Sequence, residues 1–414
     1  MSKRILPYAM WVFPLSFFTY QFILRLWPSL MMQQIMQQFQ IDATGFGVLA
    51  SVYYYGYAFM QIPVAIFLDR FGPRYVVCAC AVMCGLATLL FTYTENWTLA
   101  LVSRFLVGAG SAAGFLATSK VISLWFSRAN YARMVGFSFT VGLLGAVYGG
   151  RPVSMLVENN GWQEVASVLA YVSIGIGALT ILFLKNSTTN AEKEESTLCL
   201  KDMPKLIKSP TIWLLAISNL LMVGSLEGFA DVWGVNYLMT AMAITKAQAA
   251  DFVSFIFIGM LFGGPILAAL AKRIGNYAVI AVCSAGMVLA FMSVLFANGF
   301  FNTYGLSILF FGVGILCCYQ VLVFASGSEL VSPAMLGVTI AFLNCINMLG
   351  GSFFHSTIGW TMDQFWTGLI TDGIRQYTIE SYQYALLIIP ISALVGGFMV
   401  AIVGRQRKKS RLAV

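Results

Sequence analysis

A few charged side chains stand inside otherwise apolar stretches of this sequence, and they are the residues that could do chemistry. Arg25 interrupts "FILRLWPSL", and Arg104, Arg151, Glu227 and Asp231 interrupt similar runs. A charged side chain at the centre of a membrane helix costs ~2.5 to 3.5 kcal/mol, so we expect such residues to face a cavity or a partner. The residue types therefore predict a buried polar site for a charged solute.

The elements that hold these residues are predicted to be membrane helices. Of 414 residues, 59% are hydrophobic and only 10% are charged, whereas roughly a quarter are charged in soluble domains. Uncharged runs such as 278–299 exceed the ~20 residues that a spanning helix needs. We expect an all-α membrane protein with twelve spans. They are residues 8–35, 44–68, 74–94, 98–125, 133–156, 165–185, 211–238, 248–271, 276–297, 303–327, 335–358 and 384–404.

Lysine and arginine are distributed unevenly between the two sides of these spans. If the N-terminus is cytoplasmic, the outer segments hold only Lys246 and Arg375, an asymmetry that predicts cytoplasmic termini. A basic rim against anionic lipid accounts for the net charge of +8 without nucleic acid. We expect a monomer that spans the lipid bilayer of a bacterial cytoplasmic (inner) membrane.

The chain divides near its middle and repeats itself. A hydrophilic segment at 186–210 separates an N-terminal six-helix bundle (1–185) from a C-terminal one (211–404), and a basic tail follows at 405–414. "DRFGPR" at 69–74 is echoed 203 residues later by "KRIGNY" at 272–277. Two pseudo-symmetric six-helix bundles related in this way suit a carrier that rocks about a midplane site.

Two motifs resemble those of the major facilitator superfamily. "AIFLDRFGPR" at 65–74 is similar to its signature between helices 2 and 3, and "RFLVGAG" at 104–110 is similar to its fourth-helix motif. The resemblance covers essentially the whole chain and implies a secondary carrier, by symport or antiport, that works by alternating access. It also implies a gating role for the following residues: Asp69, Arg70, Gly72, Arg74 and Arg104. The alternative is that the loop arginines only fix the topology.

The positions of Arg25 and Glu227 suggest the solute. Position 228, which is 203 residues after Arg25, adjoins Glu227, so opposite charges are expected at nearly equivalent places in the two halves. Arg25 resembles one of two arginines that clamp phosphate in organophosphate antiporters of the superfamily, but helix 7 offers acids in place of the second. We expect a zwitterion, an amino acid or short peptide, with its carboxylate on Arg25 and its ammonium near Glu227 or Asp231. Alternatively, Arg25 and Glu227 bond only to each other.

Polar side chains on other helices are candidates to line the same site. Tyr53, Tyr57 and Gln61 form a stripe with a spacing of four residues. Gln320, Asn344 and Asn347 are the candidates in the second half. The alternative is that each of these side chains forms a hydrogen bond that holds two helices together.

Two other functions remain open. One is a carrier of organic anions or organophosphates, with Arg25 and either Arg104 or Arg151 as clamps. The other is a solute receptor that does not transport.

Coupling to protons is possible through Glu227, Asp231 or His355, the only histidine. Arg151 and His355 occupy nearly equivalent places in the two halves of the repeat, and both are candidates for coupling or gating. The sequence has no nucleotide-binding glycine loop and no cluster of metal ligands, and one histidine does not support a catalytic triad. We therefore expect no enzyme, no cofactor and no metal site.

Overall fold

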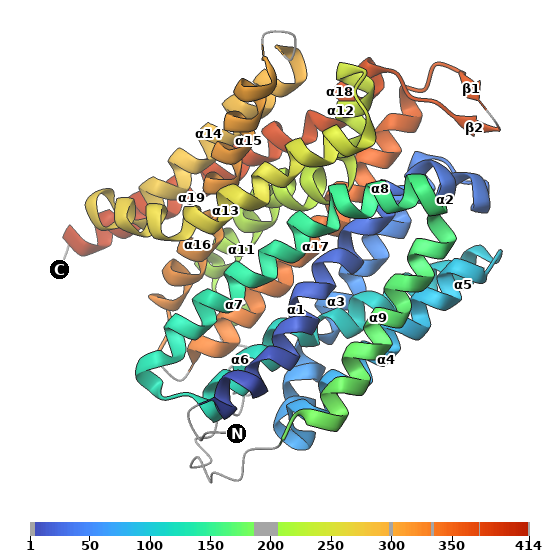
Figure 1. Ribbon diagram of the computed structural model, residues 1–414. Coiled ribbons are helices and arrows are strands. Elements are labelled where there is room, and N and C mark those ends of the chain that lie inside the picture. The colour runs from blue at the N-terminus through green and yellow to red at the C-terminus, as the bar shows by residue number, and fades with distance from the viewer. Residues whose placement is uncertain (1–4, 186–205, 298–300, 333–334, 372, 413–414) are drawn as a thin grey trace. The chain divides into compact units, whose positions relative to one another are not determined.

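A computed structural model describes residues 5–185, 206–297, 301–332, 335–371 and 373–412, and nearly all of them are helical (Figure 1). The chain forms two compact units, residues 1–41 with 49–195 and residues 42–48 with 196–414. The opening residues of one helix, α3, thus belong to the second unit, and its remainder belongs to the first.

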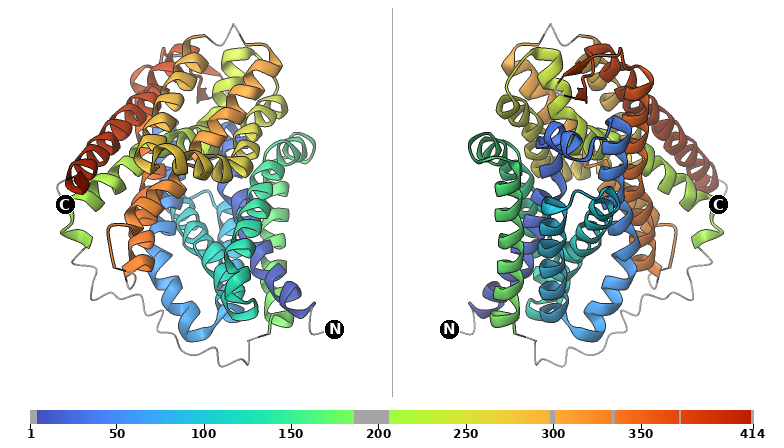
Figure 2. Two further views of the ribbon diagram at one scale, coloured as in Figure 1. Left: turned by 90° about the vertical axis from the view of Figure 1, so that its left-hand side faces the viewer. Right: turned by 90° about the vertical axis from the view of Figure 1, so that its right-hand side faces the viewer.

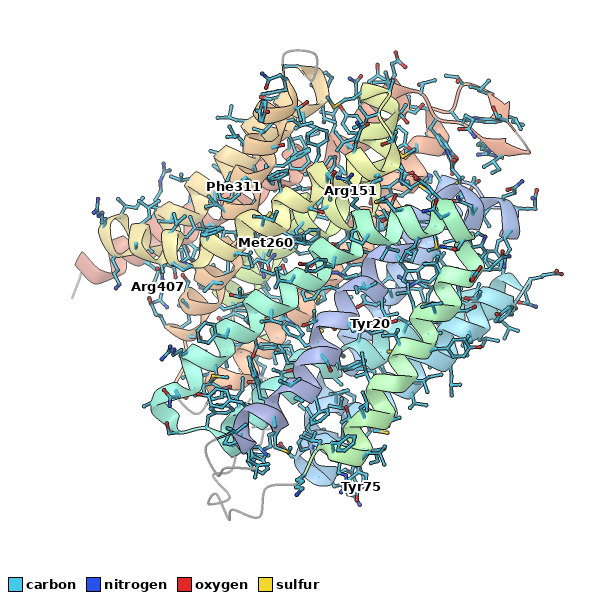
Figure 3. The ribbon with its side chains drawn as sticks, viewed as in Figure 1. Tyr20, Tyr75, Arg151, Met260, Phe311 and Arg407 are labelled. Carbon is cyan, nitrogen blue, oxygen red and sulfur yellow. The ribbon has the colours of Figure 1, made fainter. Side chains whose placement is uncertain are left out.

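The helices of the first unit run roughly alongside one another (Figure 2). Their bounds are α1 Leu6–Leu30, α2 Met32–Phe39, α3 Ala43–Phe71, α4 Pro73–Tyr93, α5 Trp97–Ser111, α6 Ala113–Trp125, α7 Arg128–Gly149, α8 Arg151–Asn160 and α9 Trp162–Phe183. The contact between α1 and α9 includes a hydrogen bond from the Tyr20 hydroxyl, labelled in Figure 3, to the Leu169 carbonyl.

The second unit contains a continuous helical segment that passes from α-helix through a 3-10 turn and a π-helix back to α-helix. The elements of this unit are α11 Pro210–Met222, the 3-10 turn η2 Val223–Ser225, the π-helix η3 Leu226–Trp233, α12 Gly234–Met242, α13 Lys246–Ile274, α14 Asn276–Phe296, α15 Thr303–Cys317, α16 Tyr319–Ser328, α17 Leu336–Gln364, the hairpin strands β1 Ile370–Thr371 and β2 Ile374–Arg375, α18 Ile379–Leu386 and α19 Ile388–Leu412. The two strands pair antiparallel.

The helices agree with the predicted all-α membrane class. Within the described part of the chain, eleven helical segments are long and apolar enough to cross a membrane. With α3, which has 29 residues, they fall on the twelve predicted spans. The α3 helix is not among the eleven because four tyrosines and Gln61 lower its mean hydropathy.

Each unit contains a seam where two helices touch through glycine. A Cβ atom added to Gly56 or Gly108 would overlap a carbonyl oxygen across the α3–α5 seam, that of Phe105 or Tyr53 respectively. The α13–α15 seam repeats this arrangement. Gly259 there faces the Phe311 carbonyl, and Gly314 faces that of Ile256; Figure 3 labels Phe311 and Met260, the neighbour of Gly259.

The spacing of the seams supports the internal repeat. Gly56 and Gly259 are 203 residues apart, and Gly108 and Gly314 are 206 apart. The side chains beside the seams differ: Tyr53 corresponds to Ile256, and Arg104 corresponds to Phe310. The packing is therefore shared by both units, whereas at these two positions only the first unit carries polar side chains.

The predicted turn at Gly72 has its counterpart in the second unit. Gly72 (φ +80°) precedes α4, and Gly275 (φ +88°) precedes α14. Positive φ values of this kind favour glycine. Pro73 follows as the first residue of α4, where its missing N–H costs nothing.

Candidate solute-binding site

Arg104 lies deep in the first unit, on α5. Asn96 caps the start of this helix, and its side chain accepts a hydrogen bond from the Leu99 N–H (3.2 Å). Arg104 is only 2% exposed. Its Nη1 donates to the Leu24 carbonyl oxygen at 3.1 Å, and its Nε has no hydrogen-bond partner among the described residues. A buried cation with one neutral acceptor can bind an additional anionic group.

Two aromatic rings flank this guanidinium group. Its carbon lies 5.1 Å from the centre of the Tyr53 ring and 5.9 Å from that of Trp27. The contact of Gly108 with the Tyr53 carbonyl brings α3 close enough to α5 to place Tyr53 there. Trp27 packs edge-on against Phe91, with ring centres 5.5 Å apart. Aromatic faces stabilise a cation without neutralising it.

Arg25, the second arginine of this region, lies near the same tyrosine, Tyr53. It is partly buried on α1, 5.0 Å from the Phe22 ring centre. Tyr53 lies near the guanidinium groups of both Arg25 and Arg104. The structure therefore brings together, in one unit, two arginines that the sequence separates by 79 positions.

The predicted polar stripe on α3 borders this pair of arginines. The Tyr53 and Tyr57 rings are stacked, with centres 6.3 Å apart and planes at 30°. Gln61 lies one turn further along and is 7% exposed. On α1, the Oε1 atom of Gln21, one turn before Arg25, has no partner among the described residues.

The acidic candidates lie in the second unit. Glu227 and Asp231 are 1% and 0% exposed, and both belong to the π-helix η3. Glu227 lies near Cys317 and Tyr319, on either side of the break between α15 and α16. Short π-helical segments occur frequently at functional sites. That Glu227 faces Arg25 stays a prediction, because the two residues belong to different units.

The remaining candidates differ in burial. His355 is fully buried on α17, and its carbonyl lies against Gly47. Gln320 and Asn344 are partly buried. Arg151, labelled in Figure 3, is exposed at the first residue of α8, so Arg104 is the more deeply buried of the two alternative clamps.

The loop motif forms two separate contacts in the first unit. Asp69 accepts a hydrogen bond from Lys120 Nζ at 2.7 Å. Arg74 donates to the Ile181 carbonyl oxygen, from Nε at 2.9 Å and from Nη2 at 2.6 Å, and so caps the end of α9. Arg70 is exposed, with its guanidinium carbon 5.3 Å from the Phe71 ring centre.

Asp363 forms a polar network in the second unit that the sequence did not reveal. Its Oδ1 accepts hydrogen bonds from Arg375 Nη1 (3.1 Å) and from the Tyr377 hydroxyl (2.5 Å). Its Oδ2 accepts from the Thr44 backbone N–H (2.7 Å) and from the Thr44 hydroxyl (2.5 Å). Arg375 also lies 3.4 Å from Asp42 Oδ2. The Asp363 network (Asp42, Thr44, Asp363, Arg375 and Tyr377) thus connects the start of α3 with the end of α17.

Sequence reasoning also missed Trp27, Lys120 as the partner of Asp69, and Asn219. Asn219 is fully buried on α11. It is the only asparagine of α11, whose other residues are mostly apolar, and this was the available signal.

Comparisons with known proteins agree on one family. A family model described as Major Facilitator Superfamily matches residues 12–355. The probable sulfoacetate transporter SauU of Cupriavidus necator is 25% identical over 260 residues, which is 58% of this chain and 60% of that protein, so the match spans less than two thirds of SauU. A putative tartrate transporter of Agrobacterium vitis is 24% identical over 375 residues, 82% of this chain and 79% of that protein.

The fold has close neighbours among solved structures. A bacterial homolog of the human lysosomal transporter Spinster, solved in an inward-facing and occupied conformation, has a TM-score of 0.75 over 97% of each chain. The sequence identity is 14%, so this likeness concerns the fold alone.

Proposed function

Because the chain belongs to the Major Facilitator Superfamily, we propose that it is a membrane transporter and that it carries a small organic anion by alternating access. Arg104 and Arg25 bind the anionic group in the first unit. Tyr53 and Tyr57 orient it, and Gln61 extends the polar stripe.

The burial of Arg104 is the observation that carries this proposal. Its guanidinium group remains charged at any physiological pH and is nearly inaccessible. The structure records no carboxylate against Arg104 among the described residues, only the Leu24 carbonyl and two aromatic rings. Burying an uncompensated charge costs several kcal/mol. A bound carboxylate or sulfonate offsets that cost and accepts two parallel hydrogen bonds.

The relatives support the same class of solute. The two curated proteins described above carry names that refer to sulfoacetate and tartrate, both small organic anions. Their names describe those proteins, and for this chain they favour the anion over the zwitterion.

Uptake by the reconstituted protein tests the proposal. Vesicles with wild-type protein should accumulate labelled organic acids, and Arg104→Gln should reduce the affinity by roughly 30-fold or more, since removing one partner of a buried charged pair costs ~2 to 5 kcal/mol. Arg104→Lys should restore part of the affinity, because the charge returns without the planar fork. Arg133, an exposed arginine on α7, supplies the matched control Arg133→Gln. Unchanged affinity in Arg104→Gln would refute the proposed site.

A zwitterion is the second candidate, favoured by the complete burial of Glu227 and Asp231. In that case an amino acid or short peptide places its ammonium near these carboxylates. Glu227→Gln distinguishes the candidates. It should abolish binding of a zwitterion and leave binding of an anion intact.

Several features of the transport cycle belong to the proposal. Glu227, Asp231 or His355 supplies a proton site if transport is proton-coupled. The Asp69–Lys120 contact, with Arg70, Gly72 and Arg74, serves as a gate. We further propose a monomer in a bacterial cytoplasmic membrane with both termini on the cytoplasmic side.

A further inference from the structure

The Leu24 carbonyl, which accepts a hydrogen bond from Arg104, belongs to a part of α1 that a proline interrupts. Pro28 lies four residues after Leu24, inside the helix. In an α-helix each carbonyl accepts a hydrogen bond from the N–H four residues later, but proline has no N–H. The regular helical donor to the Leu24 carbonyl is therefore missing.

This carbonyl needs another donor because it is buried. Leu24 is 0% exposed, and Pro28 is buried one turn further along. Buried backbone carbonyls are nearly always hydrogen-bonded, and in membrane helices a neighbouring helix can satisfy the groups that a proline frees. Here α5 does so, with Arg104 Nη1 3.1 Å from the Leu24 oxygen. The side chain of Arg104 thus takes the place of the missing N–H.

The bond at Nη1 determines which edge of the guanidinium group is left for an anion. Nε and Nη2 form one edge of this planar group, and Nη1 lies outside that edge. The Nε–H of Arg104 has no partner among the described residues. A carboxylate or sulfonate binds to such an edge through two parallel hydrogen bonds. Holding Nη1 therefore orients the binding edge before the anion arrives, which reduces the cost of ordering the side chain.

The corresponding point of the second unit is also interrupted. Position 231, which is 203 residues after Pro28, lies in the π-helix η3. A π-helix departs from the α-helical pattern because its hydrogen bonds join residues five apart. The two corresponding helices thus depart from regular α-helix at equivalent places, by different means. This recurrence supports a role for the interruption in transport.

We propose that Pro28 is a positioning residue for the solute. By freeing the Leu24 carbonyl, it provides the acceptor that holds Arg104 with its Nε–Nη2 edge toward the anion. Pro28 acts through Arg104 and not by contact with the solute. The inference rests on the proposed function, in which Arg104 binds the anionic group.

Restoring the missing N–H tests the inference on the purified, full-length protein. In Pro28→Ala the backbone N–H of the new residue competes with Arg104 for the Leu24 carbonyl. Isothermal titration with tartrate and sulfoacetate should show binding weakened by about tenfold (~1.4 kcal/mol), close to the lower end of what a hydrogen bond to a charged group contributes. Pro28→Gly restores the same N–H and should weaken binding likewise. Unchanged affinity in both variants would overturn the inference.

Pro14 provides the matched control, since it is the other proline in the interior of α1. It precedes Pro28 by 14 residues, which is about 21 Å along a helix. Pro14→Ala therefore removes a helical proline far from Arg104 and should leave the affinity unchanged. Equal weakening in Pro14→Ala and Pro28→Ala would show that the shape of α1 as a whole matters, and would overturn the inference.

A double-mutant cycle shows whether Pro28 acts through Arg104. Arg104→Met removes the donors of the side chain, so adding Pro28→Ala to it should change the residual affinity by less than about twofold. The cycle also has a readout without ligand. In Arg104→Met the buried Leu24 carbonyl lacks its donor, so Pro28→Ala should raise the Tm of this variant by more than it raises that of the wild type. Equal effects of Pro28→Ala in the two backgrounds would overturn the inference.

Failure of the proposed function gives a different result. If Arg104→Met binds the anions as tightly as the wild type, the proposed function is refuted, and the positioning role falls with it. If Arg104→Met loses affinity and Pro28→Ala does not, the proposed function stands and the inference alone is overturned. If neither anion binds, the Tm cycle decides the inference.

Discussion

Thr44 and Asp363 are 319 positions apart in the sequence, yet the backbone N–H and the hydroxyl of Thr44 both donate to one carboxylate oxygen of Asp363. The first N–H groups of a helix lack partners within that helix. Asp363 supplies one at the start of α3, where negative charge is also favoured by the helix dipole. Arg375 and Tyr377 hold the carboxylate from the other side.

We predict that Asp363→Asn destabilises the protein by about 1 to 3 kcal/mol, because an amide cannot accept all four hydrogen bonds and leaves donors unpaired. Thermal unfolding in detergent measures this change. Asp42→Asn is the matched control: asparagine still caps the Gly45 N–H (2.9 Å), and the Asp42–Arg375 pair is 37% and 36% exposed. An equal loss of stability in both variants would show that Asp363 has no special role.

The Tyr377 hydroxyl should make stability depend on alkaline pH. Burial and the hydrogen bond to Asp363 raise the pKa of Tyr377 in the folded protein, whereas an unfolded tyrosine titrates near pH ~10. The folded state therefore keeps a proton that the unfolded state loses, and stability falls as the pH rises above ~10, by at most ~1.4 kcal/mol per pH unit. The drop in Tm between pH 9 and pH 11 should be smaller in Tyr377→Phe than in the wild type. Identical drops would contradict this assignment.

The two glycine seams should differ in their effect on binding. Gly108→Ala and Gly314→Ala both force a methyl group against a backbone carbonyl, and each should cost about 1 to 3 kcal/mol of stability. Gly108→Ala should also weaken anion binding, since it displaces Tyr53 beside Arg104. Gly312, which has open space around its Cβ position, provides the control: Gly312→Ala should be neutral or stabilising. Weakened binding in Gly314→Ala alone would exclude the site in the first unit.

The Asp69–Lys120 pair should matter for transport more than for stability. Its side chains are 44% and 29% exposed, and exposed ion pairs contribute at most about 1 kcal/mol. Asp69→Lys should therefore hardly change the Tm but should slow uptake into vesicles if the pair is a gate. Adding Lys120→Asp restores the opposite charges and should recover uptake. Normal uptake in the single variant would leave the pair with a topological role only.

The membrane class, the twelve spans and the turn at Gly72 could be predicted because they depend on local composition and backbone chemistry. Arg104 could be found as a charge in an apolar helix. Its aromatic neighbours Trp27 and Tyr53 could not, because they depend on how three helices pack. Asp363 gave no signal, since a carboxylate near a helix end is ordinary and its partners at Thr44 and Tyr377 are supplied by the tertiary structure.

The repeated glycine seams also have a mechanical consequence. Where one backbone lies directly against another, sliding requires the two helices first to separate, whereas rotation of the pair as a whole disturbs nothing. The part of α3 that follows Val48 should thus move together with α5 as one rigid body, and α13 should move in the same way with α15. Spin labels placed on the two helices of one pair should therefore report a constant distance throughout the transport cycle.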